Sequence, residues 1–221
     1  MKKLVLSAAV ALMAITANAQ DATTSTDITF GAKAGVNLAT LSGDIEDNSS
    51  KIGFHVGGYA EFMVSDKFSV QPELVFSQQG TKEDYSESAS FGGDSYSYEE
   101  ETKIKANYLN LPVLAKFYVA DGFSLEAGPQ VGFLLSADLE SEFTETETIG
   151  GVTTTESGSF EADAKDAYKG IDFGLAVGAG YKLDGGLNFA LRYNLGLSSV
   201  SEDDEFDVFN NVLQFSVGYS F

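Results

Sequence analysis

Apolar residues alternate with small or polar residues in eight separate stretches of this chain. The pattern is strictest in NVLQFSVGYSF at the C-terminal end, where the odd positions from Leu213 are apolar and the even positions are small or polar. A period of two places successive side chains on opposite faces of a β-strand. The other stretches cover residues 28–39, 51–64, 68–79, 107–119, 123–135, 170–183 and 187–197. Roughly ten residues is the length that a tilted strand needs to cross a bilayer, so the sequence predicts eight transmembrane β-strands.

The segments between these stretches alternate between short and long. Residues 65–67, 120–122 and 184–186 are turn-like, and the last two contain the Asp-Gly pair that favours hairpins. The longer connections are polar and acidic, and we expect them to form β-hairpin extensions in part; they cover 40–50, 80–105, 137–168 and 198–209. Short periplasmic turns and long extracellular loops are typical of outer-membrane barrels. The predicted fold is therefore all-β: an eight-stranded antiparallel up-and-down transmembrane β-barrel with short periplasmic turns and long acidic extracellular loops.

Three prolines lie inside the predicted strands, at Pro72, Pro112 and Pro129. Proline lacks the N–H donor of a ladder hydrogen bond and is usually confined to sheet edges or bulges. We therefore expect β-bulges in the third, fourth and fifth strands.

The N-terminal end has the features of a secretory signal peptide. Two lysines precede an apolar run, and an AxA-type cleavage site follows at 17–19. The run is too short to span a bilayer as a helix, which needs roughly 20 residues. The chain has no cysteine, which argues against a lipid anchor and a disulfide framework. The predicted organisation is a signal peptide at 1–19, cleaved near Ala19/Gln20, a short N-terminal segment at 20–27 and an outer-membrane β-barrel domain at 28–221.

Alternation alone permits two opposite barrels, because a soluble lipocalin-like barrel turns its apolar face inward and a membrane barrel turns it toward lipid. The second face decides between them. It is rich in glycine, which is costly on a solvent-facing strand but makes room for long side chains inside a narrow barrel. It also carries four acids and four bases that can balance each other as internal salt bridges: Lys33, Glu61, Glu73, Lys116, Glu126, Asp172, Lys182 and Arg192. We therefore predict a membrane barrel whose lumen is plugged by charged side chains.

Aromatic residues on the apolar face gather near the strand ends at the short turns. A ring of this kind is the interfacial girdle of a membrane barrel. The predicted girdle consists of Phe62, Phe68, Phe117, Phe123, Tyr181, Phe189, Tyr219 and Phe221. Its position supports an apolar face that points toward lipid.

Several segments resemble the PorT-like outer-membrane β-barrel family, which is common in Bacteroidota. They occur in the family's order and are YLNLPVLAKFY at 108–118, GPQVGFLL at 128–135, DFGLAVGAGY at 172–181 and LRYNLGLSSV at 191–200. The resemblance implies an eight-stranded barrel with the general shape of the small OmpA and OmpX barrels. It also implies delivery to the outer membrane of a Gram-negative bacterium by periplasmic chaperones and the β-barrel assembly machinery.

The C-terminal strand looks like the aromatic signal that this assembly machinery recognises. The signal would consist of Phe215, Val217, Tyr219 and Phe221, all on the apolar face. We therefore expect the terminal strand to close the barrel beside the first strand.

Candidate catalytic and metal-binding groups are few. The single histidine, His55, lies on the inward face among glycines, away from the outer rim where a lipid-modifying enzyme would need it. The acidic runs at 142–148 and 202–207 carry carboxylates that could bind divalent cations, but neither has the glycine-turned spacing of a calcium loop. The sequence therefore predicts no catalytic residue, no cofactor and no metal site.

The charge of the mature chain limits its partners. Without the signal peptide, 11 basic residues face 33 acidic residues, so the formal charge is −22, which argues against nucleic acid. We expect membrane lipid around the barrel and an unidentified extracellular ligand at the loops. The predicted role is structural or surface-interacting, without catalysis. The main alternative is a narrow porin or channel for small solutes or ions; a lipocalin-type soluble barrel and a lipid-modifying enzyme are the remaining alternatives.

Overall fold

The computed structural model describes residues 27–45 and 49–221, and within them the chain forms nine β-strands and one short 3-10 helix. The predicted signal peptide at 1–19 and nearly all of the 20–27 segment lie outside the described residues. No helix in the described part is long and apolar enough to span a membrane. The elements are β1 (Ile28–Gly43), β2 (Ser49–Ser65), β3 (Phe68–Phe91), β4 (Asp94–Ala120), β5 (Phe123–Ile149), β6 (Val152–Asp163), η2 (Lys165–Ala167), β7 (Ile171–Lys182), β8 (Leu187–Gly196) and β9 (Val208–Ser220).

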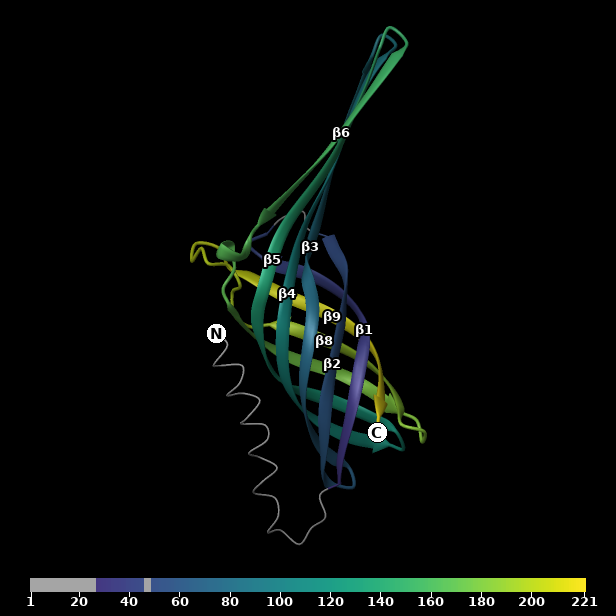
Figure 1. Cartoon of the computed structure of the whole chain (residues 1–221), viewed down its shortest axis with the longest axis vertical. Coiled ribbons are helices and arrows are strands. Elements are labelled where there is room, and N and C mark those ends of the chain that lie inside the picture. Colours follow the sequence, from purple (N-terminus) through teal and green to yellow (C-terminus); the bar gives the residue numbers. More distant parts are fainter. Residues whose placement is uncertain (1–26, 46–48) are drawn as a thin grey trace.

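Eight of the strands close into a barrel (Figure 1). Their order around the ring is β1-β2-β3-β4-β5-β7-β8-β9, and β9 pairs with β1 to complete it. Every pair in this ring is antiparallel. The predicted eight-stranded antiparallel barrel is therefore confirmed. β6 pairs only with β5 and lies outside the ring.

The barrel turns its apolar side chains outward and its polar side chains inward. In β9, Leu213 and Phe215 are 37% and 48% exposed, whereas Gln214 between them is 3% exposed. The same alternation runs through β1, where Lys33 and Asn37 are buried and Val36 is exposed. A protein in water would bury the apolar face instead, because removing apolar surface from water drives folding. The outer wall is therefore built for contact with lipid.

Closure of the barrel depends on a close approach of β1 and β9. Gly35 of β1 lies opposite Ser216, and a Cβ on Gly35 would lie 1.9 Å from the carbonyl oxygen of Phe215. It would also lie 2.7 Å from Cε1 of His55. Only glycine fits there, since backbone cannot yield as a side chain can. Glycine at this inward position thus leaves space for both the strand pairing and the imidazole.

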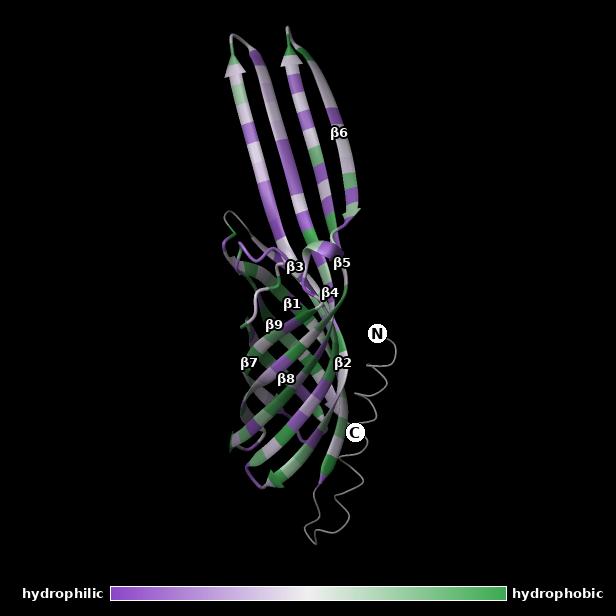
Figure 2. Ribbon diagram, turned by 90° about the vertical axis from the view of Figure 1, so that its left-hand side faces the viewer, coloured by the Kyte–Doolittle hydropathy of each residue, from purple (hydrophilic) through white to green (hydrophobic). Residues whose placement is uncertain are grey.

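Two of the long connections continue as strands well beyond the barrel. β3 and β4 pair in one register from Phe68↔Phe117 to Phe91↔Asp94, and β5 and β6 pair from Asp138↔Asp163 to Ile149↔Val152. β4 and β5 also pair along this length, so the four strands form one sheet. Figures 1 and 2 show it projecting from one end of the barrel. We call residues 81–105 and 138–163 the extension.

The hairpins of the extension end in glycine pairs. Gly92 and Gly93 have φ of 65° and 101°, and Gly150 and Gly151 have φ of 60° and 80°. Positive φ at both central residues is the backbone of the two-residue turns that match the twist of paired strands. The expected hairpin extensions are thus present. Paired strands, rather than irregular loops, make up most of 80–105 and 137–168. The described residues of the remaining connections at this end are 44–45, 164–170 and 197–207.

The prolines do not produce the bulges predicted at them. Pairing keeps one register across Pro72, Pro112 and Pro129, with a local gap in the ladder on one side of each. Register shifts occur elsewhere, for example between Asn107 and Tyr108 in the β4–β5 ladder. That prediction was therefore wrong. Each proline removes one donor, but the hydrogen bonds on either side hold the strands in register.

The predicted aromatic girdle lies on the outer face at the short-turn end. Register places Phe68 opposite Phe117, and Phe123, Tyr181 and Phe189 side by side on three neighbouring strands. These rings surround the end of the barrel opposite to the extension.

Candidate functional site

A glutamate at the centre of the barrel interior gathers two basic side chains. Arg192 of β8 holds Glu73 of β3 with two hydrogen bonds, Nη1 to Oε2 and Nη2 to Oε1, both at 2.9 Å. Lys33 of β1 donates to the same Oε2 at 2.9 Å. The guanidinium Nε donates to Glu126 of β5 at 2.8 Å. Such bidentate, charge-assisted bonds are the strong ones, and here they join four strands across the barrel.

A second carboxylate, Glu61 of β2, gathers the other basic side chains nearer the short turns. Lys116 and Lys182 lie 3.4 Å and 3.8 Å from its oxygens. Ser69 donates to Glu61 at 2.7 Å, and the Tyr118 hydroxyl also donates to it. Burial of a charge is costly unless it is paired and hydrogen-bonded, and both conditions hold for Glu61.

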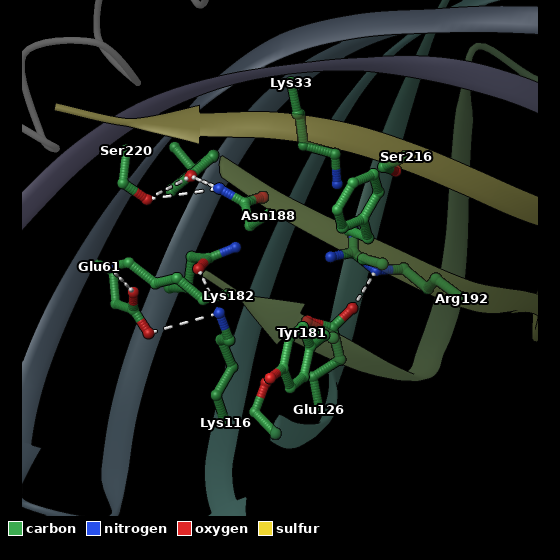
Figure 3. A pocket seen from close by; sticks show the side chains of 16 residues that line it. Lys33, Glu61, Lys116, Glu126, Tyr181, Lys182, Asn188, Arg192, Ser216 and Ser220 are labelled. Carbon is green, nitrogen blue, oxygen red and sulfur yellow. Dashed lines mark hydrogen bonds and ion pairs between the residues drawn. The ribbon is translucent and has the colours of Figure 1, made fainter. Parts of the chain in front are cut away.

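One amide joins the two clusters. Gln71 of β3 donates to Glu73 at 2.7 Å and accepts a hydrogen bond from Lys116 at 3.0 Å. Figure 3 shows Glu61, Lys116, Glu126 and Arg192 pointing into the same space from different strands. The cavity that they help to line has a volume of about 30 Å³, which is room for about two water molecules. Side chains therefore occupy nearly all of this part of the lumen.

Asp172 is the one predicted luminal residue that stands apart from these clusters. It lies at the start of β7 near the extension, where Ser198 donates to it at 3.3 Å and Asn210 at 3.4 Å. No ion pair to Asp172 is found among the described residues. The predicted balance of four acids with four bases is thus wrong in detail, because the clusters contain three acids and four bases. The alternation along a strand shows that a side chain faces inward, but not how far along the barrel axis it lies.

A neutral polar layer separates the ion pairs from Asp172. The ring nitrogens of His55 lie 2.7 Å from Asn37 Oδ1 and 2.8 Å from Ser216 Oγ. Gln214 also donates to Asn37 Oδ1, at 3.2 Å. Both nitrogens of His55 are thus engaged inside the barrel, away from the lipid-facing wall. The inward parity of the charged residues is shared by Asn37, Gln71, Tyr118 and Gln214, so the same alternation would have identified these polar side chains.

Apolar side chains close the interior at the end that carries the extension. One buried cluster consists of Ala106, Tyr108, Leu134 and Ala137, and another consists of Leu41, Val200 and Val208. Tyr168, in the connection after η2, packs against both. Backbone hydrogen bonds hold this connection to the β8–β9 connection, including Lys169 N to Val200 O at 2.8 Å. The barrel interior therefore has its ion-pair clusters toward the short turns and a neutral layer in the middle, and apolar clusters together with the buried side chains of Asp172 and Lys51 lie toward the extension.

The four residues of the predicted assembly signal lie along the outer face of β9. Phe215, Val217 and Tyr219 are 40–50% exposed, and Phe221 is 79% exposed. The backbone N–H of Phe221 donates to Phe30 O at 2.8 Å, and the rings of Tyr219 and Phe221 lie 5.7 Å apart. The pairing between β1 and the C-terminal strand thus continues through Phe221.

The closed antiparallel ring, with a lipid-type outer wall and a polar core, defines an outer-membrane barrel. Residues 18–202 match the family model described as an outer membrane protein beta-barrel domain, and the chain belongs to this family.

Solved structures of similar fold include Ail of Yersinia pestis and Neisserial surface protein A (NspA). Ail is 12% identical, with a TM-score of 0.44, and the match covers 87% of this chain and 98% of Ail. NspA is 15% identical, with a TM-score of 0.45, and the match covers 88% of this chain and 99% of NspA. CarO of Acinetobacter baumannii is 12% identical, with a TM-score of 0.35, over 86% of this chain and 97% of CarO. No match is found among curated protein sequences.

Proposed function

We propose that this chain is a plugged outer-membrane barrel that acts at the cell surface through its extension, without catalysis. The observation that carries the proposal is the extension itself. Three barrel strands, β3, β4 and β5, continue out of the ring, β6 pairs with them as a fourth strand, and each pairs over about twelve residues. Both faces of this sheet lie outside the barrel, so it contributes nothing to closing the ring. A structured surface of this size is a platform for recognition rather than a connection between strands.

The contents of the lumen support a plugged barrel. Seven charged side chains form paired clusters across it, and apolar clusters close its other end. An eight-stranded barrel has an interior just wide enough for side chains to fill. A solute would have to displace Arg192 from two carboxylates, which would leave Glu126 buried without an ion pair and Glu73 with Lys33 alone.

The cellular setting is part of the proposal. The signal peptide at 1–19, cleaved near Ala19/Gln20, would direct the chain to the periplasm of a Gram-negative bacterium. Periplasmic chaperones and the β-barrel assembly machinery would then insert it, with Phe215, Val217, Tyr219 and Phe221 as the signal. The quoted segments support a place in the PorT-like group, and the lipid of the outer membrane would be the barrel's immediate partner. The short turns would face the periplasm and the extension the cell exterior.

The alternative function is a narrow channel, and its supporting observation is the charged, partly open end near the short turns. Lys182 there retains a third of its side-chain exposure, so solvent reaches the Glu61 cluster. Planar-bilayer recordings separate the two functions. We expect no steady conductance from the plugged barrel. Steady, ion-selective openings that change when Lys116 or Arg192 is replaced would establish the channel instead.

Trimming the extension tests the surface role directly. In one variant, two-residue glycine turns replace residues 83–102 and 141–160, which leaves the barrel and the Tyr168 connection intact. Cells that produce this variant or the full chain are compared for aggregation and for adhesion to defined surfaces. We expect equal amounts of folded barrel but loss of aggregation or adhesion in the trimmed form. Equal behaviour of the two strains would contradict the surface role.

A further inference from the structure

The two faces of the extension differ in chemistry. Register sorts its residues into two sets, since neighbours across the strands lie on the same face. One set, the hydroxyl face, is rich in serine and threonine: Ser86, Ser88, Ser90, Ser95, Ser97, Thr144, Thr146, Thr148, Thr153, Thr155, Ser157 and Ser159. The other, the aromatic face, carries rings and apolar groups: Tyr85, Phe91, Tyr96, Tyr98, Phe143, Ile149, Val152 and Phe160. Figure 2 shows the alternating hydropathy along these strands that produces the two faces.

Three rings form a diagonal stripe across the aromatic face. Tyr85 of β3 meets Tyr98 of β4 edge-on, with centroids 6.2 Å apart, and Tyr98 stacks on Phe143 of β5 at 6.2 Å and 19°. Gly158 of β6 lies opposite Phe143, and a Cβ there would lie 2.5 Å from that ring. The stripe therefore spans the whole width of the sheet. Tyr85 keeps 52% of its surface exposed, so the stripe lies open to solvent.

The carboxylates of the aromatic face have no basic partners. This face carries seven acids, Glu83, Glu87, Asp94, Glu100, Glu145, Glu147 and Glu156, and no lysine or arginine within 81–105 and 138–163. Two of these acids accept hydrogen bonds from the stripe, Glu87 from Tyr85 at 3.2 Å and Glu100 from Tyr98 at 3.0 Å. Glu87 and Glu145 lie directly opposite Tyr98 on its two sides. The rings are thus set in a field of uncompensated negative charge.

All three lysines of the extension lie on the hydroxyl face instead. Lys82 pairs with Asp84 at 3.0 Å and also with Glu101, Lys103 pairs with Glu101, and Lys105 pairs with Glu140. Hydrogen bonds from Lys103 and Lys82 hold the pKa of Glu101 below its usual value. The hydroxyl face also carries acids, which are Asp84, Glu99, Glu101, Asp138, Glu140, Glu142, Glu161 and Asp163. Its three lysines compensate part of that charge, whereas the aromatic face has no compensation within the extension. Solubility alone would call for no such segregation.

We propose that the aromatic face binds a cationic, amphipathic polypeptide segment of a partner protein. Its lysine or arginine side chains would lie against Tyr85, Tyr98 and the surrounding carboxylates, since cations are attracted to ring faces and to opposite charge. Its apolar side chains would cover the exposed groups near the hairpin tips, where Phe91 is 90% exposed. This inference rests on the surface role proposed above and names the chemistry of the partner.

Charge argues against two other occupants of this face. A second copy of the chain would set seven acids against seven acids, and like charges brought together across an interface are destabilising. An anionic lipid surface would be repelled for the same reason. The parity of β3 and β4 also places the aromatic face in continuity with the inner wall of the barrel, because Tyr85 and Tyr98 share the alternation of Gln79 and Tyr108. The partner would therefore lie over the two apolar clusters that close this end of the barrel.

Binding of a defined probe tests the proposal. The probe is a labelled peptide of alternating arginine and tyrosine, compared with a peptide in which glutamate replaces each arginine. The mature full chain is titrated in neutral detergent, and the barrel with the trimmed extension gives the background from the micelle. We expect saturable binding of the arginine peptide only, weakened by salt because screening reduces the attraction. Equal binding of both peptides, or of the arginine peptide to both proteins, would overturn the proposal.

Matched variants locate the binding face. Glu87→Gln with Glu145→Gln removes two charges beside Tyr98, and Glu99→Gln with Glu142→Gln removes two charges from the hydroxyl face. Because removal of close charges weakens an electrostatic interface most, we expect about tenfold weaker binding for the first pair and less than about twofold for the second. Tyr98→Ser should also weaken binding, and Ser97→Ala should not. Equal losses from both charge pairs would mean attraction to net charge alone and would overturn the assignment of the face.

These outcomes are distinguishable from failure of the surface role. If the trimmed strain loses adhesion or aggregation but the arginine peptide does not bind, the surface role stands and the cationic partner is rejected. If the trimmed strain behaves like the full chain, the surface role fails whatever the peptide does. Folding of every variant is checked by the shift in gel migration between its folded and heat-unfolded forms.

Discussion

The barrel interior and the aromatic face of the extension both concentrate polar and charged groups, but they treat charge in opposite ways. Inside the barrel, Glu73 forms ion pairs with Lys33 and Arg192 and is fully buried. On the aromatic face, seven acids have no basic partner and lie beside rings. A buried charge is costly unless it is paired or hydrogen-bonded, whereas an exposed charge costs little unpaired and stays available to a partner. The interior therefore contributes stability, and the extension carries the proposed recognition surface.

Removal of the central cation should have the largest effect. Arg192→Ala leaves Glu73 with Lys33 alone and Glu126 without its ion pair, and breaking a buried pair costs about 3–5 kcal/mol. We expect the free energy of unfolding to fall by that amount, measured by urea titration of the refolded barrel with gel migration as the readout.

Lys82→Ala in the extension is the matched control, because Lys82 also contacts two carboxylates but keeps 30% of its side chain exposed. It should leave the urea midpoint unchanged. Comparable losses from Arg192→Ala and Lys82→Ala would remove the distinction between the two regions.

Deletion of the last three residues should have the next largest effect. Residues 219–221 pair with β1 through Ala32↔Tyr219 and through the hydrogen bond from Phe221 N to Phe30 O. Their loss shortens the seam that closes the ring and removes two residues of the predicted assembly signal. We expect a severalfold lower yield of folded protein in the outer-membrane fraction, since every strand of a closed barrel must be paired.

Deletion of three residues at the tip of the β5–β6 hairpin, 150–152, provides the comparison within the extension. This deletion removes no pairing of the ring, so its yield should match that of the full chain. Equal yields from the two deletions would show that the terminal strand has no special role in assembly.

Tyr168→Ala probes the boundary between the two regions. The ring packs against both apolar clusters. Truncating a fully buried aromatic ring lowers the free energy of unfolding by about 3–5 kcal/mol, and the loss should be smaller here because the Tyr168 ring is only partly buried. We expect faster amide hydrogen exchange in 164–170 and 197–207, with exchange in β1 and β8 unchanged. The conductance should stay at zero because the ion pairs below still fill the lumen. Opening of a pore in this variant would place the plug at Tyr168 rather than at the charged clusters.

The sequence predicted the ring better than it predicted the extension, for a physical reason. In the ring one face meets lipid, so Phe215 and its neighbours must be apolar and the alternation is strong. In the extension both faces meet water, and a run such as Thr153 to Thr155 shows no alternation. The sequence therefore predicted hairpin extensions in part of 137–168 without giving the bounds of β6. Inside the barrel, parity identified the charged residues. The position of Asp172 and the link through Gln71 depend on strand register, which alternation does not give.

The smallest expected effect concerns the pH dependence of the hydroxyl face. Hydrogen bonds from Lys103 and Lys82 lower the pKa of Glu101 from its ordinary value of 4.5. A carboxyl whose pKa is lower in the folded state than in the unfolded state contributes stability above its ordinary pKa, and this contribution is lost as the pH falls through the lower value. We therefore expect acidification below pH 4.5 to increase amide exchange locally around 82–84 and 101–103, and Glu101→Gln to abolish that dependence. Because these groups are partly exposed, salt should weaken the effect, whereas Glu73 and Arg192 should hold the barrel together at either salt concentration. A salt-sensitive global unfolding over the same pH range would show instead that the stability of the barrel depends on surface charges of the extension.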